Sequence, residues 1–362
     1  MSNLQTTEKW RPSASLILVA KSKSVGTNYN LLMLKRSDRT AIMPNQTVFP
    51  GGLLDTEADE TVAWLQYFDE FGIKEEALRQ LVLIHDNRPN ILAPQGTGCY
   101  DRFFKRTSIW AREIILRLTA LRECFEEVGI LLCRNRNNLD YGQVAQYENV
   151  PDLEYWQQRV HNKPSEFLEL CRTLKVVPDL WALYEWSAWA SPATVGKRHE
   201  TVFFIAFVDT QPTLLSEPSE VKQTMWLTPL EFLRLARLNE IWFLPPQVYE
   251  LSRLLTIKDY ESLLEFSKQR SRLGTTMFMP VAYVCGEAMV CVLPGDDFYV
   301  KESHLATEYI EFPGTSEEFR ARAKLVHRYD LFGPAALNVE LNFPPPNGHL
   351  KPQNLPKDLL KL

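Results

Sequence analysis

Residues 121–132 read Leu-Arg-Glu-Cys-Phe-Glu-Glu-Val-Gly-Ile-Leu-Leu and place three carboxylates in an otherwise apolar segment. The apolar residues recur at helical rather than strand spacing, so this segment is predicted to be a helix. Positions i, i+3 and i+4 of a helix share one face, and Glu123, Glu126 and Glu127 have this relationship. Their like charges repel, at about 0.2–0.5 kcal/mol per pair. A positive charge is therefore expected close to this face.

Two interpretations of the acidic face remain open at this point. The first is a solvated face of an amphipathic helix, with Arg122 pairing to Glu126 at i+4. The second is a site for a divalent cation, because hard cations such as Mg²⁺ take oxygen ligands from carboxylates and substrate phosphates. Gly129 is placed to end the helix. The helix by itself does not distinguish the two interpretations.

The bulk properties are those of an ordinary globular protein. A chain of 362 residues can bury a large core, as one elaborated domain or two. The net charge of −5 argues against broad nucleic-acid or membrane-surface binding. The longest apolar runs, such as residues 201–208, are too short to cross a bilayer, so no membrane partner is expected. Six scattered cysteines indicate free thiols in a reducing compartment.

The order of predicted elements indicates an α/β (α+β) fold with a mixed sheet. Between residues 55 and 107 short helical patterns alternate with loop signals, and a long helical pattern then runs from 108 to 132. After Pro344-Pro345-Pro346 the sequence is polar, and this tail is predicted to be disordered. The predicted strands are 13–21, 29–36, 181–190, 199–208 and 221–227, followed by a hairpin over 275–293.

Two separated segments together resemble the Nudix box, G-x5-E-x7-R-E-U-x-E-E-x-G-U, where U is a bulky aliphatic residue. They are Val-Phe-Pro-Gly-Gly at 48–52 and Arg-Glu-x-x-Glu-Glu-x-Gly-Ile at 122–130. Two departures are present. Gly52 and Arg122 are 70 positions apart, and the first glutamate is missing, since Ala58 or Ile114 occupies its place and Glu113 lies one position off. Because a long loop costs little closure entropy, the box is predicted to be split by an insertion.

The resemblance extends to one subgroup, the motif-19 Nudix hydrolases, which act on coenzyme A and acyl-CoA esters. It covers most of the chain, from about residue 10 to the region of Tyr329-Asp330. The segment Leu32–Gly52 also resembles the CoA-recognition element of other Nudix enzymes, although Ala41 and Asn45 replace its second arginine and its first glycine. The residues that carry the subgroup resemblance are Arg36-Ser37, Trp181-Ala182-Leu183, Trp186-Ser187-Ala188-Trp189 and Trp226-Leu227.

The resemblance implies a set of site residues. Mg²⁺ or Mn²⁺ would be bound by Glu123, Glu126 and Glu127. The catalytic residues would be Glu123, Glu126 and Arg122, with the arginine supporting the metal ligands. The cofactor- and substrate-binding residues would be Arg36, for a phosphate of the substrate, and Gly51 and Gly52, of which Gly52 would offer its backbone carbonyl to the metal. The general base would be Glu123, Glu200 or Glu220, of which Glu123 is the preferred candidate.

The predicted organisation is a Nudix α/β/α sandwich over residues 10–256, with the insertion at about 55–107. Residues 257–343 are predicted to form a C-terminal extension packed on this domain, and 344–362 a disordered tail. The expected reaction is hydrolysis of the diphosphate bond of coenzyme A or acyl-CoA, giving 3′,5′-ADP and (acyl-)4′-phosphopantetheine. The alternatives are another substrate, such as a nucleotide sugar, a dinucleotide or capped RNA, and a binding module without turnover.

The end of the chain also carries a prediction about location. Ser-Lys-Leu at a C-terminus is a peroxisomal address, and Leu360-Lys361-Leu362 keeps two of its three residues. The first fifteen residues lack the arginine-rich amphipathic pattern of a mitochondrial presequence. A peroxisomal location is therefore expected, with the mitochondrion or the cytosol as the alternative.

Overall fold

The computed structural model describes residues 10–23, 26–39, 43–84, 88–93, 111–139, 144–331 and 337–355. Two parallel strands form its centre, β1 (Arg11–Lys21) and β9 (His199–Val208). Their register runs from Arg11 opposite His199 to Ala20 opposite Val208. Both faces of β1 are covered by other elements, which explains why its sequence is a nearly continuous apolar run.

The described strands form three sheets. The large sheet has the order β10-β2-β1-β9-β8-β11, with β3 paired to β2 and β4 paired to β1; a second sheet has the order β14-β12-β13-β15-β16, and a third β6-β5-β7. The bounds of the strands in the large sheet, besides β1 and β9, are β2 Tyr29–Arg36, β3 Thr47–Val48, β4 Gly51–Leu53, β8 Tyr184–Ala190, β10 Val221–Leu227 and β11 Met277–Phe278. Those of the other two are β5 Leu131–Asn135, β6 Tyr147–Glu148, β7 Val176–Pro178, β12 Val281–Cys285, β13 Ala288–Val292, β14 Ile310–Phe312, β15 His327–Leu331 and β16 Leu337–Leu341.

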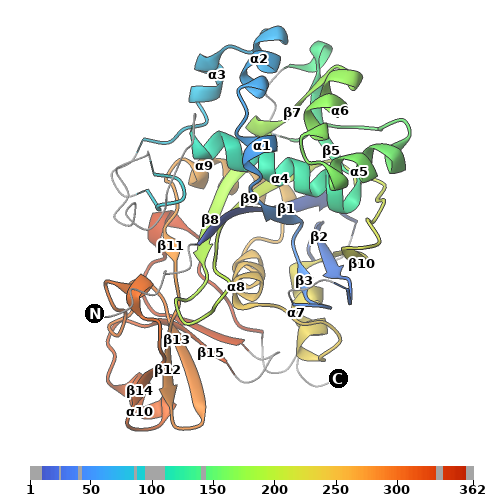
Figure 1. The fold of residues 1–362 in the computed structure, drawn as a ribbon. Helices are drawn as coiled ribbons and strands as arrows, with labels where there is room; N and C mark the ends of the chain where they lie inside the picture. Colours follow the sequence, from blue (N-terminus) through green and yellow to red (C-terminus); the bar gives the residue numbers. More distant parts are fainter. Residues whose placement is uncertain are drawn as a thin grey trace.

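Helices cover both faces of the large sheet, so the predicted α/β/α sandwich is confirmed (Figure 1). Successive side chains of β1 alternate between the two faces. Leu16 and Leu18 pack in one core cluster with α4 (Arg112–Val128), whereas Ile17 and Val19 pack in a second cluster with α7 (Pro229–Arg237), α8 (Pro245–Leu254) and α9 (Tyr260–Ser271). The helix that carries the acidic segment therefore packs against β1 on the opposite side of the sheet from α7, α8 and α9.

The insertion between β4 and α4 contains three short helices in its described part, α1 (Thr56–Asp59), α2 (Ala63–Glu70) and α3 (Glu75–Arg79). Trp64 and Phe68 of α2 belong to the same core cluster as α4. After β5 the chain forms α5 (Leu153–Asn162) and α6 (Glu166–Leu174) on the same side. Within the described ranges, no helix combines the length and apolar character that a membrane span requires.

The C-terminal part forms the five-stranded sheet together with α10 (Ser316–Ala321). The predicted hairpin over 275–293 is present as β12 and β13, with Cys285 opposite Ala288. The prediction that disorder begins at residue 344 was wrong for residues 344–355. Leu350 is buried in the second core cluster, and the Asn354 side chain bonds both the N–H and the C=O of Val339 at 2.9 Å. A few apolar and amide side chains anchor this polar segment, which composition alone does not reveal. Residues 356–362, with the expected targeting signal, lie outside the described residues.

Candidate active site

The acidic segment forms the last turns of α4. The helix ends at Val128, and Gly129 follows in the left-handed conformation at φ 72°. Its N–H bonds the Phe125 carbonyl at 2.9 Å, as expected for a glycine after the last helical residue. Strand β5 begins at Leu131. The backbone turn at Gly129 therefore sets where the helix stops, close behind its three glutamates.

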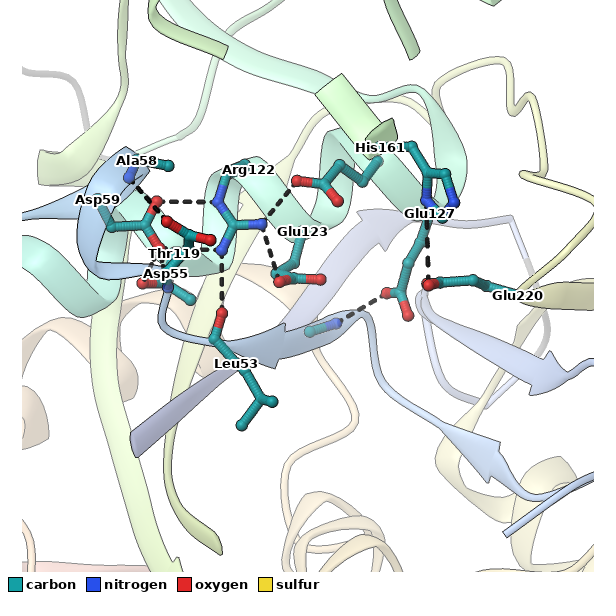
Figure 2. Close-up of polar contacts among 12 residues, drawn as sticks. Leu53, Asp55, Ala58, Asp59, Thr119, Arg122, Glu123, Glu127, His161 and Glu220 are labelled. Carbon is teal, nitrogen blue, oxygen red and sulfur yellow. Dashed lines mark hydrogen bonds and ion pairs between the residues drawn. The ribbon is translucent and has the colours of Figure 1, made fainter. Parts of the chain in front are cut away.

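Arg122 is the centre of a buried network of carboxylates, shown in Figure 2. Its Nε and Nη2 donate to the two carboxylate oxygens of Asp59 at 2.8 and 2.9 Å. Its Nη1 donates to Glu123 at 2.9 Å and to Glu126 at 2.6 Å, and Nη2 also donates to the Leu53 carbonyl at 3.0 Å. Burial alone would lower the pKa of Arg122, but Asp59 and the glutamates hold that pKa well above its ordinary value. The helical pair of Arg122 and Glu126 is therefore part of this network rather than a solvated surface pair.

Asp59 belongs to this network and was not among the candidates named from the sequence. It lies one position after Ala58, where the motif expects its first glutamate, and its side chain is buried. Besides Arg122, its carboxylate accepts hydrogen bonds from Thr119 Oγ1 at 2.8 Å and from the Asp55 N–H at 3.0 Å. The sequence did contain one indication of its role, because Asp59 is acidic and lies one position after the place expected for the first glutamate. The insertion thus supplies the acidic partner of the arginine, and the supporting contact that the sequence left in doubt is present.

The two glycines of β4 allow the backbone to lie directly against the acidic face. The Gly51 N–H donates to Glu127 Oε2 at 2.9 Å. A Cβ at Gly52 would lie 2.4 Å from Glu123 Oε2, so the absence of a side chain there lets the Glu123 carboxylate reach the strand. Gly51 has a φ of 150°, and a Cβ there would lie 2.3 Å from the Ala14 carbonyl oxygen. Gly51 therefore requires glycine, because its φ and the backbone of β1 exclude a Cβ, whereas a Cβ at Gly52 would displace the Glu123 carboxylate.

The site holds more negative charge than Arg122 can balance. Burial raises the pKa of both Glu123 and Glu127, and burial followed by the charge of Glu123 raises the pKa of Glu126 to about 8. Asp59, Glu123 and Glu126 contact the one guanidinium of Arg122, and Glu127 adds a fourth buried carboxylate that has no contact with it and accepts from the Gly51 N–H instead. Such an excess of buried charge is unfavourable unless a cation compensates it.

The donor set fits a hard divalent cation in its chemistry, because it offers carboxylate oxygens only. In the part of the chain that the structure describes, no three His, Cys, Asp or Glu side chains are arranged to hold an ion as they stand. The reason is visible in their contacts: Glu123 and Glu126 turn to Arg122, while Glu127 turns to Gly51. The sequence prediction brought the three glutamates to one face, and in the structure Glu123 and Glu126 share Arg122 while Glu127 binds the backbone of Gly51.

A loop that follows β9 brings a further carboxylate, Glu220, to the acidic face. The loop is tied to the end of α4 by the Glu217 N–H, which donates to the Glu127 carbonyl at 3.0 Å. The Ser37 N–H donates to the Glu220 carbonyl at 2.7 Å, which joins the loop to the end of β2. His161 Nδ1 of α5 lies 3.9 Å from Glu220 Oε1 (Figure 2). Burial is the main cause of the raised pKa of Glu123 and Glu127, and the charge of Glu220 adds a smaller contribution to both. The three carboxylates are therefore neighbours.

The two other sequence candidates differ in their positions. Glu200 is buried on β9, and its charge acts on Arg112, which begins α4. Arg112 and Glu123 are eleven residues apart on one helix, about 16 Å along its axis, so Glu200 lies away from the acidic face. Arg36 ends β2, and its positive charge partly offsets the effect of burial on the pKa of Glu127. Its Nε is buried and has no hydrogen-bond partner among the described residues. Arg36 is thus available to an anionic ligand beside the acidic helix.

An acidic helix that faces a Gly-Gly strand within an α/β/α sandwich defines the class of Nudix hydrolases. A Nudix hydrolase from Alicyclobacillus acidocaldarius has the same fold, with a TM-score of 0.51 and 18% sequence identity over 71% of this chain and 96% of that one. Residues 10–254 match the family model described as the NUDT19 Nudix domain, so the chain belongs to this family of Nudix diphosphatases.

Two relatives in this family match most of the chain. A Xenopus laevis protein is 32% identical over 328 residues, which cover 84% of each chain. A Homo sapiens protein is 29% identical over 368 residues, covering 96% of this chain and 95% of the relative. Both relatives bear the name acyl-coenzyme A diphosphatase NUDT19.

Proposed function

We propose that this enzyme hydrolyses the diphosphate bond of coenzyme A or acyl-CoA and releases 3′,5′-ADP and (acyl-)4′-phosphopantetheine. The observation that carries the proposal is the buried excess of carboxylates around Arg122, placed against a Gly-Gly strand with Arg36 beside it. A diphosphate is anionic and would be repelled by bare carboxylates, so the site suits this substrate only with a cation present. The names of the two relatives support the substrate class.

Glu123, Glu126 and Glu127 would hold Mg²⁺ or Mn²⁺. When bound, such an ion neutralises charge on the phosphoryl oxygens and lowers the pKa of a bound water. Arg122 orients Glu123 and Glu126 through its Nη1, and Asp59 in turn fixes the guanidinium from its other edge. The positive charge of Arg122 favours the ionised form of both carboxylates and so opposes the rise in pKa that burial causes.

Arg36 supplies the positive charge for a phosphate group of the substrate. A guanidinium forms charge-assisted hydrogen bonds to phosphate oxygens, and its Nε is free of partners among the described residues. Its proximity to the Glu127 charge puts it on the same side as the metal ligands.

We assign the general base to Glu220 rather than to Glu123, the candidate preferred from the sequence. A general base must reach the attacking water and must be free to accept its proton. Glu123 is held by Arg122 at 2.9 Å, whereas the Glu220 side chain is 40% exposed and, among the described residues, pairs with no cationic side chain closer than His161 at 3.9 Å. Glu220→Gln should lower kcat by about 10²–10⁴-fold with little change in the metal concentration needed for half-maximal rate. If Glu123→Gln gives that pattern and Glu220→Gln does not, the assignment reverts to Glu123.

The substrate proposal is tested by hydrolysis of a panel with Mg²⁺ or Mn²⁺ and separation of the products by mass. The panel contains CoA, a short and a long acyl-CoA, a nucleotide sugar, a dinucleotide and capped RNA. The proposal expects release of 3′,5′-ADP from CoA or its esters at a higher kcat/KM than for any other member. If another member of the panel is hydrolysed at a higher kcat/KM, the enzyme is a diphosphatase of that substrate and the CoA proposal is wrong. If no member is hydrolysed with either metal, the result favours the alternative of a binding module without turnover.

We also propose a peroxisomal location, which rests on Leu360-Lys361-Leu362 at the C-terminus. A fluorescent protein fused in front of the full chain should collect in peroxisomes and become diffuse when the last two residues are deleted. An intact fusion that is diffuse or mitochondrial would refute the proposal.

A further inference from the structure

A small pocket, lined by apolar as well as polar side chains, lies between β8, α8, α9 and the segment around residue 347. Its volume is about 10 Å³, which is room for one water-sized species. Trp186 in its wall belongs to the core cluster of α8 and α9, on the other face of the large sheet from α4. The cavity is therefore separate from the acidic site described above.

Three side chains that line the cavity have a buried polar atom without a hydrogen-bond partner among the described residues. These atoms are Ser187 Oγ, Arg253 Nε and Arg270 Nε. The His349 ring in the same wall accepts from the Leu350 N–H at 2.7 Å and is hydrogen-bonded to the Trp186 backbone. All three unpaired groups can donate. A water molecule accepts about two hydrogen bonds and has two hydrogens of its own to place, whereas an anion accepts all three.

The charge around the cavity also favours an anion. Arg270 donates to the carbonyls of Gly274 and Glu185 and forms no ion pair with a carboxylate in the described structure. Arg253 pairs with Glu250 at 3.0 Å, but that carboxylate also accepts both neighbouring indole N–H groups. Two guanidiniums line the cavity, Arg253 and Arg270, and Glu250 pairs with the first of them. The other carboxylate near Arg270, Glu185, is already bound at both oxygens by Arg88. An uncompensated buried charge is costly, and a bound anion would balance it.

We propose that this cavity is a binding site for one small monovalent anion, of which chloride is the natural probe. The cavity is too small for a tetrahedral oxyanion such as phosphate or sulfate. The anion would join α8 and α9 to β8, which carries Ser187. The site stabilises the folded chain and takes no part in the hydrolysis, so it is independent of the proposed substrate.

The test is thermal unfolding of the full chain at constant ionic strength, with sodium gluconate progressively replaced by sodium chloride or bromide. A ligand that binds only the folded state raises Tm with the logarithm of its concentration once it exceeds Kd. Wild type should therefore gain a few degrees in halide. Ser187→Ala removes one donor to the anion and should weaken the apparent halide affinity about tenfold, with Tm in gluconate close to wild type. Arg172→Gln, at an exposed surface ion pair, is the matched control and should behave as wild type.

Two further readouts keep the test decisive. In crystals grown with bromide, an anomalous peak should lie within contact distance of Arg270 and Ser187. Arg270→Met should abolish the halide dependence, and if that variant fails to fold, Ser187→Ala and the bromide peak still decide. Equal Tm in gluconate and chloride, identical halide responses of wild type and Ser187→Ala, or a cavity without bromide would each overturn the proposal and leave a buried water in its place.

Discussion

Replacing Asp59 by asparagine tests whether the insertion completes the catalytic network. The two side chains have the same shape, but asparagine carries no charge and has a donor in place of one oxygen. Asp59 accepts from Arg122 Nε and Nη2 at 2.8 and 2.9 Å, from Thr119 Oγ1 at 2.8 Å and from the Asp55 N–H at 3.0 Å. At least one of these donors must face an N–H₂ group in the variant, whichever way the amide is turned.

The magnitude follows from the burial of the pair. The side chains of Arg122 and Asp59 are each 2% exposed, so solvent cannot replace the lost charge. One lost charge-assisted hydrogen bond costs about 1.5–3 kcal/mol, and removing one partner of a buried ion pair typically costs about 3–5 kcal/mol in total. Arg122 would then depend on Glu123 and Glu126 for compensation. We expect a loss of about 3–5 kcal/mol in the free energy of unfolding, and a loss of about 10–100-fold in metal affinity or activity.

Urea unfolding followed by circular dichroism measures the free energy of unfolding, and hydrolysis at varied Mg²⁺ concentration measures metal affinity and activity. Asp69→Asn is the matched control, because Asp69 is in the same insertion and pairs with Lys74, with side chains 62% and 66% exposed. That change should cost at most about 1 kcal/mol and leave activity unaltered. If Asp59→Asn behaves like the control in both assays, Asp59 does not support the site and Arg122 is held by the glutamates alone.

Four further predictions concern the site and the C-terminal part. Glu127→Gln should leave less than about a tenth of the hydrolysis rate with an unchanged fold, because it removes one ligand charge from an isosteric side chain. Gly52→Ala should also lower activity strongly while costing little stability, since the atom that a Cβ would meet is the mobile end of Glu123. Arg36→Ala should weaken the use of CoA far more than that of 3′-dephospho-CoA if the guanidinium binds the 3′-phosphate. His327 is buried with its pKa lowered to about 4, so stability present above pH 6.5 should fall by up to about 3 kcal/mol between pH 6.5 and 4.

Each of these predictions has a contrasting measurement. Gly51→Ala, where a Cβ would meet backbone, should lower stability as well as activity, unlike the change at the neighbouring glycine. If Arg36→Ala lowers kcat/KM equally for CoA and 3′-dephospho-CoA, Arg36 does not bind the 3′-phosphate and has a structural or diphosphate-binding role instead. The sign of the pH effect follows because the unfolded histidine takes up a proton before the folded one does as the pH falls. His327→Gln should flatten the pH profile between 6.5 and 4, and an unchanged slope would exclude His327 as its cause. For Glu127→Gln, a rate near that of wild type would contradict the metal role.

The local parts of this protein were readable in the sequence. The helical period placed Glu123, Glu126 and Glu127 on one face, and Gly129 marked the end of the helix, because both follow from backbone geometry within a few residues. The alternating and apolar runs likewise located β1, β2, β8 and β9. The spacing of the second half of the box identified the family before any tertiary contact was known.

Only the tertiary structure decided which distant groups complete the site. Asp59 pairs with an arginine 63 residues away, and no local period connects the two positions. Glu200 and Glu220 are equally acidic in sequence, but backbone hydrogen bonds that join the loop to α4 and β2 bring Glu220, and not Glu200, beside the acidic end of α4. The order of residues 344–355 depends similarly on a core that other segments build. Because closing a long loop costs little free energy, contacts of this kind are set by the surroundings of each side chain, and spacing along the chain cannot reveal them.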